Sequence, residues 1–531
     1  MKKSHILLFV LSFFCVSVFA QEKALIIPAP QSVKYGEGEL KWGKSVNIVC
    51  SPGLLNEASI LKDCLLNEYK SNASINKKSR ANVMLSIDKK LASKPAGAYE
   101  LTVDSKGVKI LAAENSGIYY GVQSLLQILR KEKDALVLQK MAVEDYPAFQ
   151  WRSFMLDESR HFKGKEVVKD LLDRLGRQKM NVFHWHLTDD QGWRIEIKKY
   201  PKLTEIGSYR DSTQIGGYLG TKYDGVPHRG FYTQEDIKEI VEYASKRHIT
   251  IIPEIEMPGH ATAAIASYPW LGVTGDSIKV SCFFGSKHYD IYNVADPKVL
   301  GFIEDVVDEL IPLFPAHIIH IGGDEVRYDQ WEQSAFVQDY MKNNRIAGPS
   351  DLQVQFTNNL SRFIKDKGAR MIGWNEITGA KVNDYQLTDT TNANSKLAQG
   401  TLVQFWKGDL SLIQKTAEEG YDVVNSFHAS TYLDYTYEML PLEKSYSFNP
   451  IPEGLPENLK SKIVGGECLL WSEEIPDVQS MYNQIFPRVA AYAEDFWTLP
   501  QNKDFKRFES ALSQLKKNAA IYPSLIWENN K

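Results

Sequence analysis

The residues with the clearest potential for chemistry lie at 316–325, Ala-His-Ile-Ile-His-Ile-Gly-Gly-Asp-Glu. This apolar run is typical of a buried parallel strand, and its two glycines allow the backbone to pass close to a bulky group. Because the chain turns where a strand ends, Asp324 and Glu325 can both face one cavity. Such a pair can keep one acid protonated beside a charged one, which is acid–base chemistry. By residue type alone, two solvated acids would be the ordinary alternative.

Reactive or aromatic side chains also follow the other apolar runs of the second half of the chain. In chain order these segments are Asp157-Glu158-Ser159-Arg160-His161, His184-Trp185-His186-Leu187-Thr188-Asp189-Asp190, Glu254-Ile255-Glu256-Met257-Pro258-Gly259-His260, Trp374-Asn375-Glu376, Gln404-Phe405-Trp406, Tyr432-Leu433-Asp434 and Trp471-Ser472-Glu473. Any one segment is a weak signal. Such groups at the end of every run are hard to explain as packing, because charged residues are rarely core residues.

The elements that must position these groups alternate between short apolar runs and helical patterns, which is typical of βα units and a parallel sheet. We predict strands at 152–156, 181–187, 250–255, 318–321, 371–374, 401–406, 422–426 and 463–470, and helices at 164–180, 233–248, 296–314 and 351–367. Eight such units predict an α/β fold, a (β/α)8 TIM barrel, with the site at the carboxyl ends of the strands. A doubly wound sheet competes, but no glycine-rich phosphate motif follows the first strand.

The remaining sequence predicts a small α+β accessory domain before the barrel and a helix after it. The expected division is a signal peptide at 1–20, the accessory domain at 21–147, the barrel at 148–500 and a C-terminal helix packing on the barrel within 501–531. Within the accessory domain we expect a strand at 83–87, a hairpin formed by 99–103 and 108–111, and a helix at 116–129.

The first twenty residues have the basic start, apolar centre and small-residue end of a secretory signal. We therefore expect an exported protein, periplasmic or secreted after cleavage near Ala20, with no membrane span in the mature chain. The net charge of −4 over 531 residues argues against nucleic acid as a partner. Four later cysteines, Cys50, Cys64, Cys282 and Cys468, show no disulfide framework or zinc spacing, and their pairing stays open.

Several of these motifs together resemble glycoside hydrolase family 20, the β-N-acetylhexosaminidases. The resemblance rests on Ser159-Arg160-His161-Phe162, Phe183 to Asp190, Pro258-Gly259-His260, His320 to Val326 and Leu470-Trp471-Ser472-Glu473, which occur in the family's order. It implies an exo-acting, retaining enzyme that removes terminal GlcNAc or GalNAc from an oligosaccharide or glycoconjugate. In this family the substrate's own acetamido group is the nucleophile, and an oxazolinium intermediate forms. The resemblance implies no cofactor and no metal.

The resemblance also implies roles for individual residues. Glu325 would be the general acid and then the base, with its pKa raised by Asp324 and by burial, while Asp324 stays ionised and orients the acetamido group. Tyr432 would donate its hydroxyl to the acetamido oxygen. The remaining assignments are Trp374, Trp406 and Trp471 as pocket walls, Arg160, Asp434 and Glu473 as ligands of sugar hydroxyls, and Asp189 and His260 as a relay to Glu325.

Other interpretations stay open at this point. A glycan-binding protein without turnover could use the same scaffold, and a metal-dependent barrel enzyme could use Asp324 and Glu325 as Mg²⁺ ligands. His184 and His186 share a strand face and could bind a metal, although we interpret them as residues of the barrel interior. We interpret Glu158, Asp190 and Glu376 as supporting or solvated acids, and Trp185 and Trp331 as packing residues.

The leaving-group side of the substrate is expected to meet the loops at 207–232, 270–292 and 428–460. The last loop carries Tyr435, Tyr437, Tyr446 and Phe448, which could form an aromatic platform for that part of the substrate. The natural glycan, the preference between GlcNAc and GalNAc, and the oligomeric state do not follow from the sequence.

Overall fold

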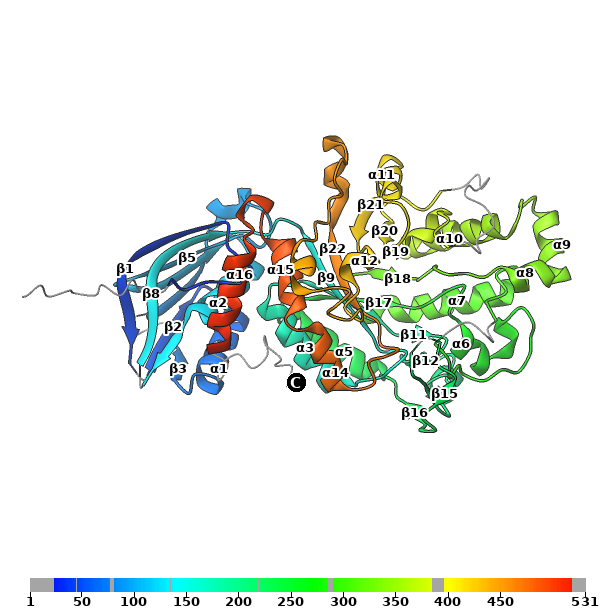
Figure 1. The fold of residues 1–531 in the computed structure, drawn as a ribbon, viewed down its shortest axis with the longest axis horizontal. Helices are drawn as coiled ribbons and strands as arrows, with labels where there is room; N and C mark the ends of the chain where they lie inside the picture. Colours follow the sequence, from blue (N-terminus) through cyan, green and yellow to red (C-terminus); the bar gives the residue numbers. More distant parts are fainter. Residues whose placement is uncertain are drawn as a thin grey trace, which may run out of the picture.

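A computed structural model describes residues 23–43, 45–76, 81–133, 135–217, 219–284, 290–383 and 396–517. The expected signal peptide lies outside the described residues. The chain forms an N-terminal domain built on a curved sheet, and a larger barrel domain beside it (Figure 1).

The barrel of the described chain is closed by eight parallel strands, which confirms the predicted fold class. Around the barrel the order is β10 (Val182–His186), β17 (Thr250–Glu254), β18 (Ile318–His320), β19 (Arg370–Trp374), β20 (Leu402–Phe405), β21 (Asp422–Asn425), β22 (Ile463–Leu470) and β9 (Trp151–Asp157). Every predicted strand exists, with ends that differ from the prediction by at most two residues. The strands are buried on both faces, which explains why they occur as continuous apolar runs.

Helices cover the outside of the barrel and follow the predicted pattern. They are α3 (Lys165–Arg177), α4 (Lys202–Glu205), α5 (Gln234–Ser245), α6 (Thr262–Ser267), α7 (Pro297–Leu310), α8 (Asp329–Gln333), α9 (Ala335–Asn343), α10 (Pro349–Asp366), α11 (Ser411–Glu418), α12 (His428–Thr431), α13 (Leu442–Tyr446), α14 (Val478–Ile485) and α15 (Arg488–Trp497). The start of α5 is a capping box between Thr233 and Asp236, and α7 begins at Pro297 with Asp296 as its cap.

Three short hairpins extend the loops at the carboxyl side of the barrel between β10 and α5. They pair β11 (Thr188–Asp189) with β12 (Gly192–Trp193), β13 (Tyr209–Arg210) with β16 (His228–Arg229), and β14 (Gln214–Ile215) with β15 (Lys222–Tyr223). They lie together below the barrel in the view of Figure 1.

The N-terminal domain is one mixed sheet with two helices against it. Its strands run in the order β1 (Ser32–Trp42), β8 (Ala135–Asp145), β5 (Tyr99–Asp104), β6 (Gly107–Ala112), β4 (Val83–Ile87), β2 (Ser45–Cys50) and β3 (Asn72–Ile75), with β7 (Arg130–Glu132) on β8 and the helices α1 (Leu55–Asn67) and α2 (Asn115–Ile128). The predicted hairpin is the antiparallel pair of β5 and β6.

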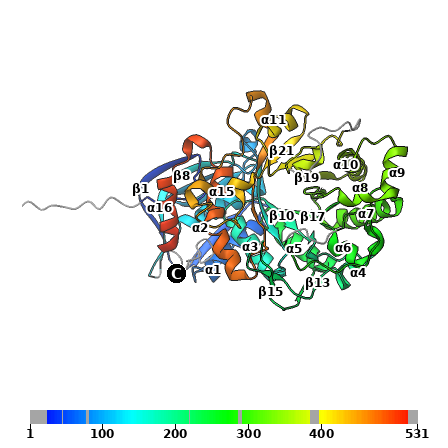
Figure 2. The same cartoon turned by 45° about the vertical axis from the view of Figure 1, so that its right-hand side comes forward.

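The C-terminal helix α16 (Phe505–Lys517) corrects one expectation, because its apolar face does not rest on the barrel alone. Phe508, Ala511, Leu512 and Leu515 join the core of the N-terminal domain. The helix lies beside α2, against the concave side of the sheet (Figures 1 and 2). The side chain of Gln514 accepts the N–H of Leu25 at 3.0 Å. The end of the chain therefore returns to its beginning, a placement that periodicity cannot reveal.

Within the described residues, none of the helices combines the length and the apolar character that crossing a membrane requires. Cys64, Cys282 and Cys468 are free thiols.

Candidate active site

The two adjacent acids are turned into one pocket by the backbone that follows β18. Gly322 and Gly323 have φ angles of +65° and +92°, and Glu325 has +48°. A Cβ on Gly322 would lie 1.7 Å from a carboxylate oxygen of Glu256, and one on Gly323 would lie 2.6 Å from Ile377. Both positions therefore need glycine for conformation and for space. The expected close approach is confirmed, and the neighbouring groups are the carboxylate of Glu256 at Gly322 and the side chain of Ile377 at Gly323.

A pocket of about 350 Å³ opens at this end of the barrel. Its walls are Arg160, Asp189, His260, Phe284, Asp324, Glu325, Trp406, Tyr432, Asp434, Tyr435, Trp471, Glu473 and Glu474. Ten of the eleven candidate residues of the sequence therefore line one cavity, although they come from seven separate segments of the chain. The size is in the range of small-molecule sites.

The eleventh candidate, Trp374, does not line the pocket but packs behind the aromatic residues that do. Its side chain is 1% exposed and packs with Met155, Tyr432 and Leu469. Its ring centroid is 6.0 Å from that of Trp471, and its indole N–H donates to Glu254 at 2.8 Å. Trp374 thus supports the aromatic wall from below.

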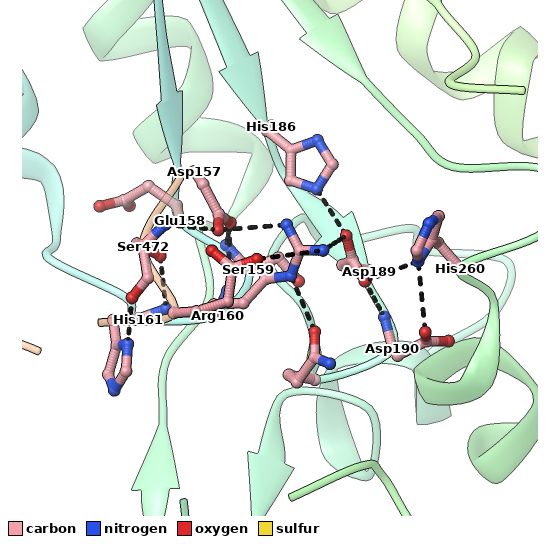
Figure 3. A network of polar contacts seen from close by, with 12 residues as sticks. Asp157, Glu158, Ser159, Arg160, His161, His186, Asp189, Asp190, His260 and Ser472 are labelled. Carbon is pink, nitrogen blue, oxygen red and sulfur yellow. Dashed lines mark hydrogen bonds and ion pairs between the residues drawn. The ribbon is translucent and has the colours of Figure 1, made fainter. Parts of the chain in front are cut away.

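His260 connects the acid pair to a second pair of acids, Asp189 and Asp190, and Figure 3 shows its contacts with this second pair. Its Nε2 lies 3.7 Å from Glu325 Oε2 and 3.9 Å from Asp324 Oδ2. Its Nδ1 lies 3.3 Å from both Asp189 Oδ1 and Asp190 Oδ2. Burial lowers the pKa of His260, but Asp189, Asp190 and Glu325 raise it well above the ordinary value. The ring is therefore an imidazolium that faces all four carboxylates.

Arg160 closes one side of the pocket, and a neighbouring side chain holds each of the three nitrogens of its guanidinium. It contacts Asp189 at 2.7 Å and Asp157 at 3.3 Å, and its Nε donates to Gln191 at 2.9 Å (Figure 3). Glu473 lies 3.9 Å away. These contacts hold a planar, charged donor group at the edge of the cavity, which suits the recognition of oxygen-rich ligands.

The protonation of the acid pair in the free protein is the reverse of what the sequence suggested. Burial raises the pKa of Asp324 to about 7, because it outweighs the attraction of His260 and acts together with the charges of Glu325 and Glu254. Burial also raises the pKa of Glu325, but His260, Lys407 and Arg160 outweigh this and leave it below the ordinary value. The prediction of a raised pKa for Glu325 is therefore wrong for the ligand-free state. The physical reason is that Glu325 is 37% exposed and adjoins an imidazolium, while Asp324 is deeply buried.

Aromatic rings form another wall of the pocket. The ring of Tyr432 lies nearly parallel to that of Trp406, at an interplanar angle of 11°, with the centroids 6.4 Å apart. Trp471 lies 6.1 Å from Tyr432 and carries the Arg160 guanidinium 5.0 Å from its ring centroid. Such flat apolar faces beside polar groups suit the C–H faces of sugar rings.

Two residues that line the cavity each have one carboxyl oxygen without a hydrogen-bond partner within the described chain. Asp324 Oδ1 and Asp434 Oδ1 are buried and have no hydrogen-bond partner. Burial and the charge of Glu473 raise the pKa of Asp434 to about 8, and burial also raises that of Glu473. A buried polar atom without a partner costs about 1–3 kcal/mol, so both atoms indicate places where a ligand binds.

The residues that we set aside mostly have structural partners. Glu158 is fully buried and is bound by the Tyr232 hydroxyl, so it is a supporting acid and not a solvated one. Glu376 accepts the indole N–H of Trp406 at 3.0 Å. Trp185 and Trp331 are both 0% exposed, which confirms them as core residues. Asp190 is the exception, since it reaches His260 directly.

The proposed platform of four aromatic residues is corrected by their burial. Tyr446 lies in the core of the N-terminal domain and Phe448 in that of the barrel. The Tyr437 hydroxyl donates to backbone carbonyls near α14, so its side chain is engaged. Tyr435 alone of the four lines the pocket. Sequence reasoning also missed Phe284 and Glu474, which lie on loops and have no periodic signal.

Three groups of described residues could hold a metal ion, because within each group the ligand atoms lie within 4.8 Å of one another. They are His184, Glu254 and His320; His186, Glu254 and Glu256; and Asp189, Asp190 and His260. Asp324 and Glu325, the ligands in the magnesium interpretation, belong to none of them. His184 and His186 lie inside the barrel and contact Glu254, as expected for interior residues.

The closed parallel barrel with an acid pair, a guanidinium and aromatic walls at its carboxyl end places the chain in the class of (β/α)8 barrel proteins with a polar, aromatic-walled site. Comparison with known families makes this specific. The catalytic domain of glycosyl hydrolase family 20 matches residues 149–500, and domain 2 of the same family matches residues 23–146. The chain therefore belongs to glycosyl hydrolase family 20.

Individual relatives agree with this membership. A β-hexosaminidase of Porphyromonas gingivalis is 38% identical over 80% of this chain and 54% of its own length, and one of Vibrio furnissii is 36% identical over 75% and 64%. The chain thus spans between half and two thirds of these curated relatives. A solved exo-β-N-acetylglucosaminidase from Vibrio harveyi, in complex with N-acetylglucosamine, has a TM-score of 0.81 at 30% identity and covers 95% of this chain and 78% of its own.

Proposed function

We propose that this chain is an exo-acting β-N-acetylhexosaminidase that removes terminal, non-reducing GlcNAc or GalNAc with retention of configuration. The observation that carries the proposal is that Asp324 and Asp434, which line one pocket from different strand ends, each have a buried oxygen without a hydrogen-bond partner. Both oxygens can accept hydrogen bonds, and a sugar that carries an acetamido N–H and several hydroxyls supplies the donors. Family membership and the names of the relatives point the same way.

Asp324 is the proposed partner of the acetamido group. An N–H that donates to its free Oδ1 favours the ionised carboxylate and so lowers its pKa from about 7. The acetamido oxygen then attacks the anomeric carbon while the bond to the leaving oxygen breaks, and the oxazolinium ion carries the positive charge beside Asp324. This interaction strengthens as the charge develops, which is the requirement for faster chemistry.

Glu325 is the proposed acid and base. The proton that Asp324 gives up on substrate binding is available to Glu325, and the Nε2 of His260 lies within 4 Å of both groups. Glu325 then protonates the leaving oxygen, and its carboxylate later removes a proton from the water that opens the oxazolinium ion. The ionised Asp324 beside Glu325 then favours the protonated form of Glu325, which reconciles the lowered pKa of Glu325 in the free protein with its action as an acid.

The rest of the pocket holds the sugar. Tyr432, whose ring centroid lies 6.4 Å from that of Trp406 and 6.1 Å from that of Trp471, is proposed to donate its hydroxyl to the acetamido oxygen. Arg160, Asp434 and Glu473 are proposed to bind the hydroxyls on the other side of the ring. The pocket volume of about 350 Å³ is at the small end of the range for small-molecule sites, which supports a single terminal sugar as the ligand.

The stereochemistry of the product tests this mechanism. Proton NMR of the first product released from an aryl β-N-acetylglucosaminide should show the β anomer before it mutarotates. The α anomer as first product would refute acetamido participation. A protein that binds GlcNAc without turnover would support the alternative of a glycan-binding scaffold.

A further inference from the structure

A row of buried acids and imidazoles crosses the barrel interior and ends at the pocket. Glu467 contacts His184 at 2.9 Å, His184 contacts Glu254 at 3.1 Å, Glu254 contacts His186, His186 contacts Asp189 at 3.0 Å, Asp189 contacts His260 at 3.3 Å, and His260 lies 3.7 Å from Glu325. Acid and base alternate at every step. From Glu467 to Asp189 each residue is at most 2% exposed, so this part of the row is shielded from bulk solvent.

Glu254 is the branching point of this row. Its Oε2 faces His184 and His186 on β10, and its Oε1 lies 2.9 Å from His320 on β18 and accepts the Trp374 indole N–H at 2.8 Å. Burial raises the pKa of Glu254, but the three imidazoles hold it well below the ordinary value. Transferring a charge from water into the barrel interior costs several kcal/mol. An apolar layer in place of these charged residues would therefore stabilise the barrel equally well.

His186 transmits the position of Glu254 to the pocket. Its Nδ1 contacts Glu254, so its Nε2 is left to face Asp189 (Figure 3). Asp189 uses one oxygen for His186 and Arg160, and the other faces Nδ1 of His260. With Nδ1 held in this way, the Nε2 of His260 points at Glu325. Partners of this kind orient the groups that act directly.

We propose that Glu254 is a positioning residue for Glu325, acting through His186 and Asp189 on the His260 ring that faces the acid. This inference rests on the proposed role of Glu325 as general acid. Besides its three imidazoles, Glu254 is influenced by the nearby acids Glu256 and Asp324. None of these contacts reaches the substrate, so Glu254 acts through its neighbours, by position through His186 and by its charge on Asp324.

The dependence on the leaving group separates positioning from mere stability. A poor leaving group, such as a second sugar, needs protonation by Glu325, whereas 2,4-dinitrophenolate leaves without it. Glu254→Gln should lower kcat/KM about tenfold for the disaccharide and less than threefold for the dinitrophenyl glycoside, as part of the 10²–10⁴-fold that acid catalysis supplies. Equal losses on both substrates would overturn the proposal.

Glu467→Gln is the matched control, because Glu467 is equally buried and binds the same histidine layer without contacting His186. This variant should change kcat/KM by the same factor for the disaccharide and for the dinitrophenyl glycoside. His186→Gln is a second variant for the case in which Glu254→Gln does not fold. It keeps a donor for Asp189 but breaks the contact with Glu254, so the same selective loss is expected, and equal losses would again refute the idea.

An assay without turnover separates this inference from the proposed function. The imidazole NMR signals of His260, assigned by their absence in His260→Gln, should move in Glu254→Gln and stay in place in Glu467→Gln. Unmoved signals in Glu254→Gln would refute positioning even if the wild type were active. Moved signals with an inactive wild type would instead refute the proposed function alone.

Discussion

Replacing Asp324 by Asn should stabilise the folded chain at neutral and alkaline pH. In the folded protein the pKa of Asp324 is raised by burial to about 7, from an ordinary value of 3.8. The unfolded chain therefore binds fewer protons at this group between pH 4 and 7, and stability falls as the pH rises through that window. Asn does not titrate, so the variant avoids this loss.

The size of the effect follows from the shift. About three pKa units at 1.36 kcal/mol each give about 4 kcal/mol as the largest pH-dependent difference between variant and wild type. For about 500 residues the entropy of unfolding is about 1 kcal/mol/K, so the gap in Tm should widen by about 4 °C between pH 4 and pH 8. The side chain of Asp324 is 11% exposed, so solvent screening is small.

Scanning calorimetry of both proteins from pH 4 to pH 8 measures this gap. Glu325→Gln is the informative counterpart, because the pKa of Glu325 is lowered by the charges around it, chiefly His260, against the effect of burial. The difference in Tm between this variant and the wild type should change in the opposite direction and mainly below about pH 4.5, the ordinary pKa of a glutamate, so the scans of this pair extend down to about pH 3. If the difference in Tm between Asp324→Asn and the wild type stays constant with pH, or narrows as the pH rises, the raised pKa of Asp324 is refuted. The proposed transfer of its proton to Glu325 is then refuted as well.

Three further predictions concern activity. Tyr432→Phe should lower kcat about 10²-fold with little change in KM, because its hydroxyl is proposed to act on charge that develops in the transition state; an unchanged kcat would remove Tyr432 from the mechanism. Arg160→Lys should lower kcat/KM about tenfold or more, since an ammonium cannot replace the planar fork that contacts Asp157, Asp189 and Gln191; a value within threefold of wild type would contradict this. Treatment with EDTA should leave kcat/KM unchanged, whereas a loss that Mg²⁺ restores would favour the metal-dependent interpretation.

The sequence was sufficient for the barrel because its strands are buried on both faces. Strand β22 has the bounds expected from its apolar run, and the capping box at Thr233 marks the start of α5. The strand ends also pointed to the pocket, since a barrel brings them together whatever their separation in the chain.

What the sequence did not predict depends on neighbours from distant segments. The protonation of Asp324 and Glu325 is set by unequal burial and by His260, which comes from another strand. Tyr446 and Tyr435 belong to the same loop, yet the first is a core residue and the second lines the pocket. Residue type and spacing are the same for either outcome, so only the tertiary structure distinguishes them.

The most direct test of the central claim compares hydrolysis of an aryl β-N-acetylglucosaminide and an aryl β-glucoside by the wild type, Asp324→Asn and Glu325→Gln. We predict that the wild type cleaves the N-acetylated substrate alone and that Asp324→Asn loses this activity. Equal cleavage of both substrates by the wild type would contradict the account, because the acetamido group would then not be the nucleophile.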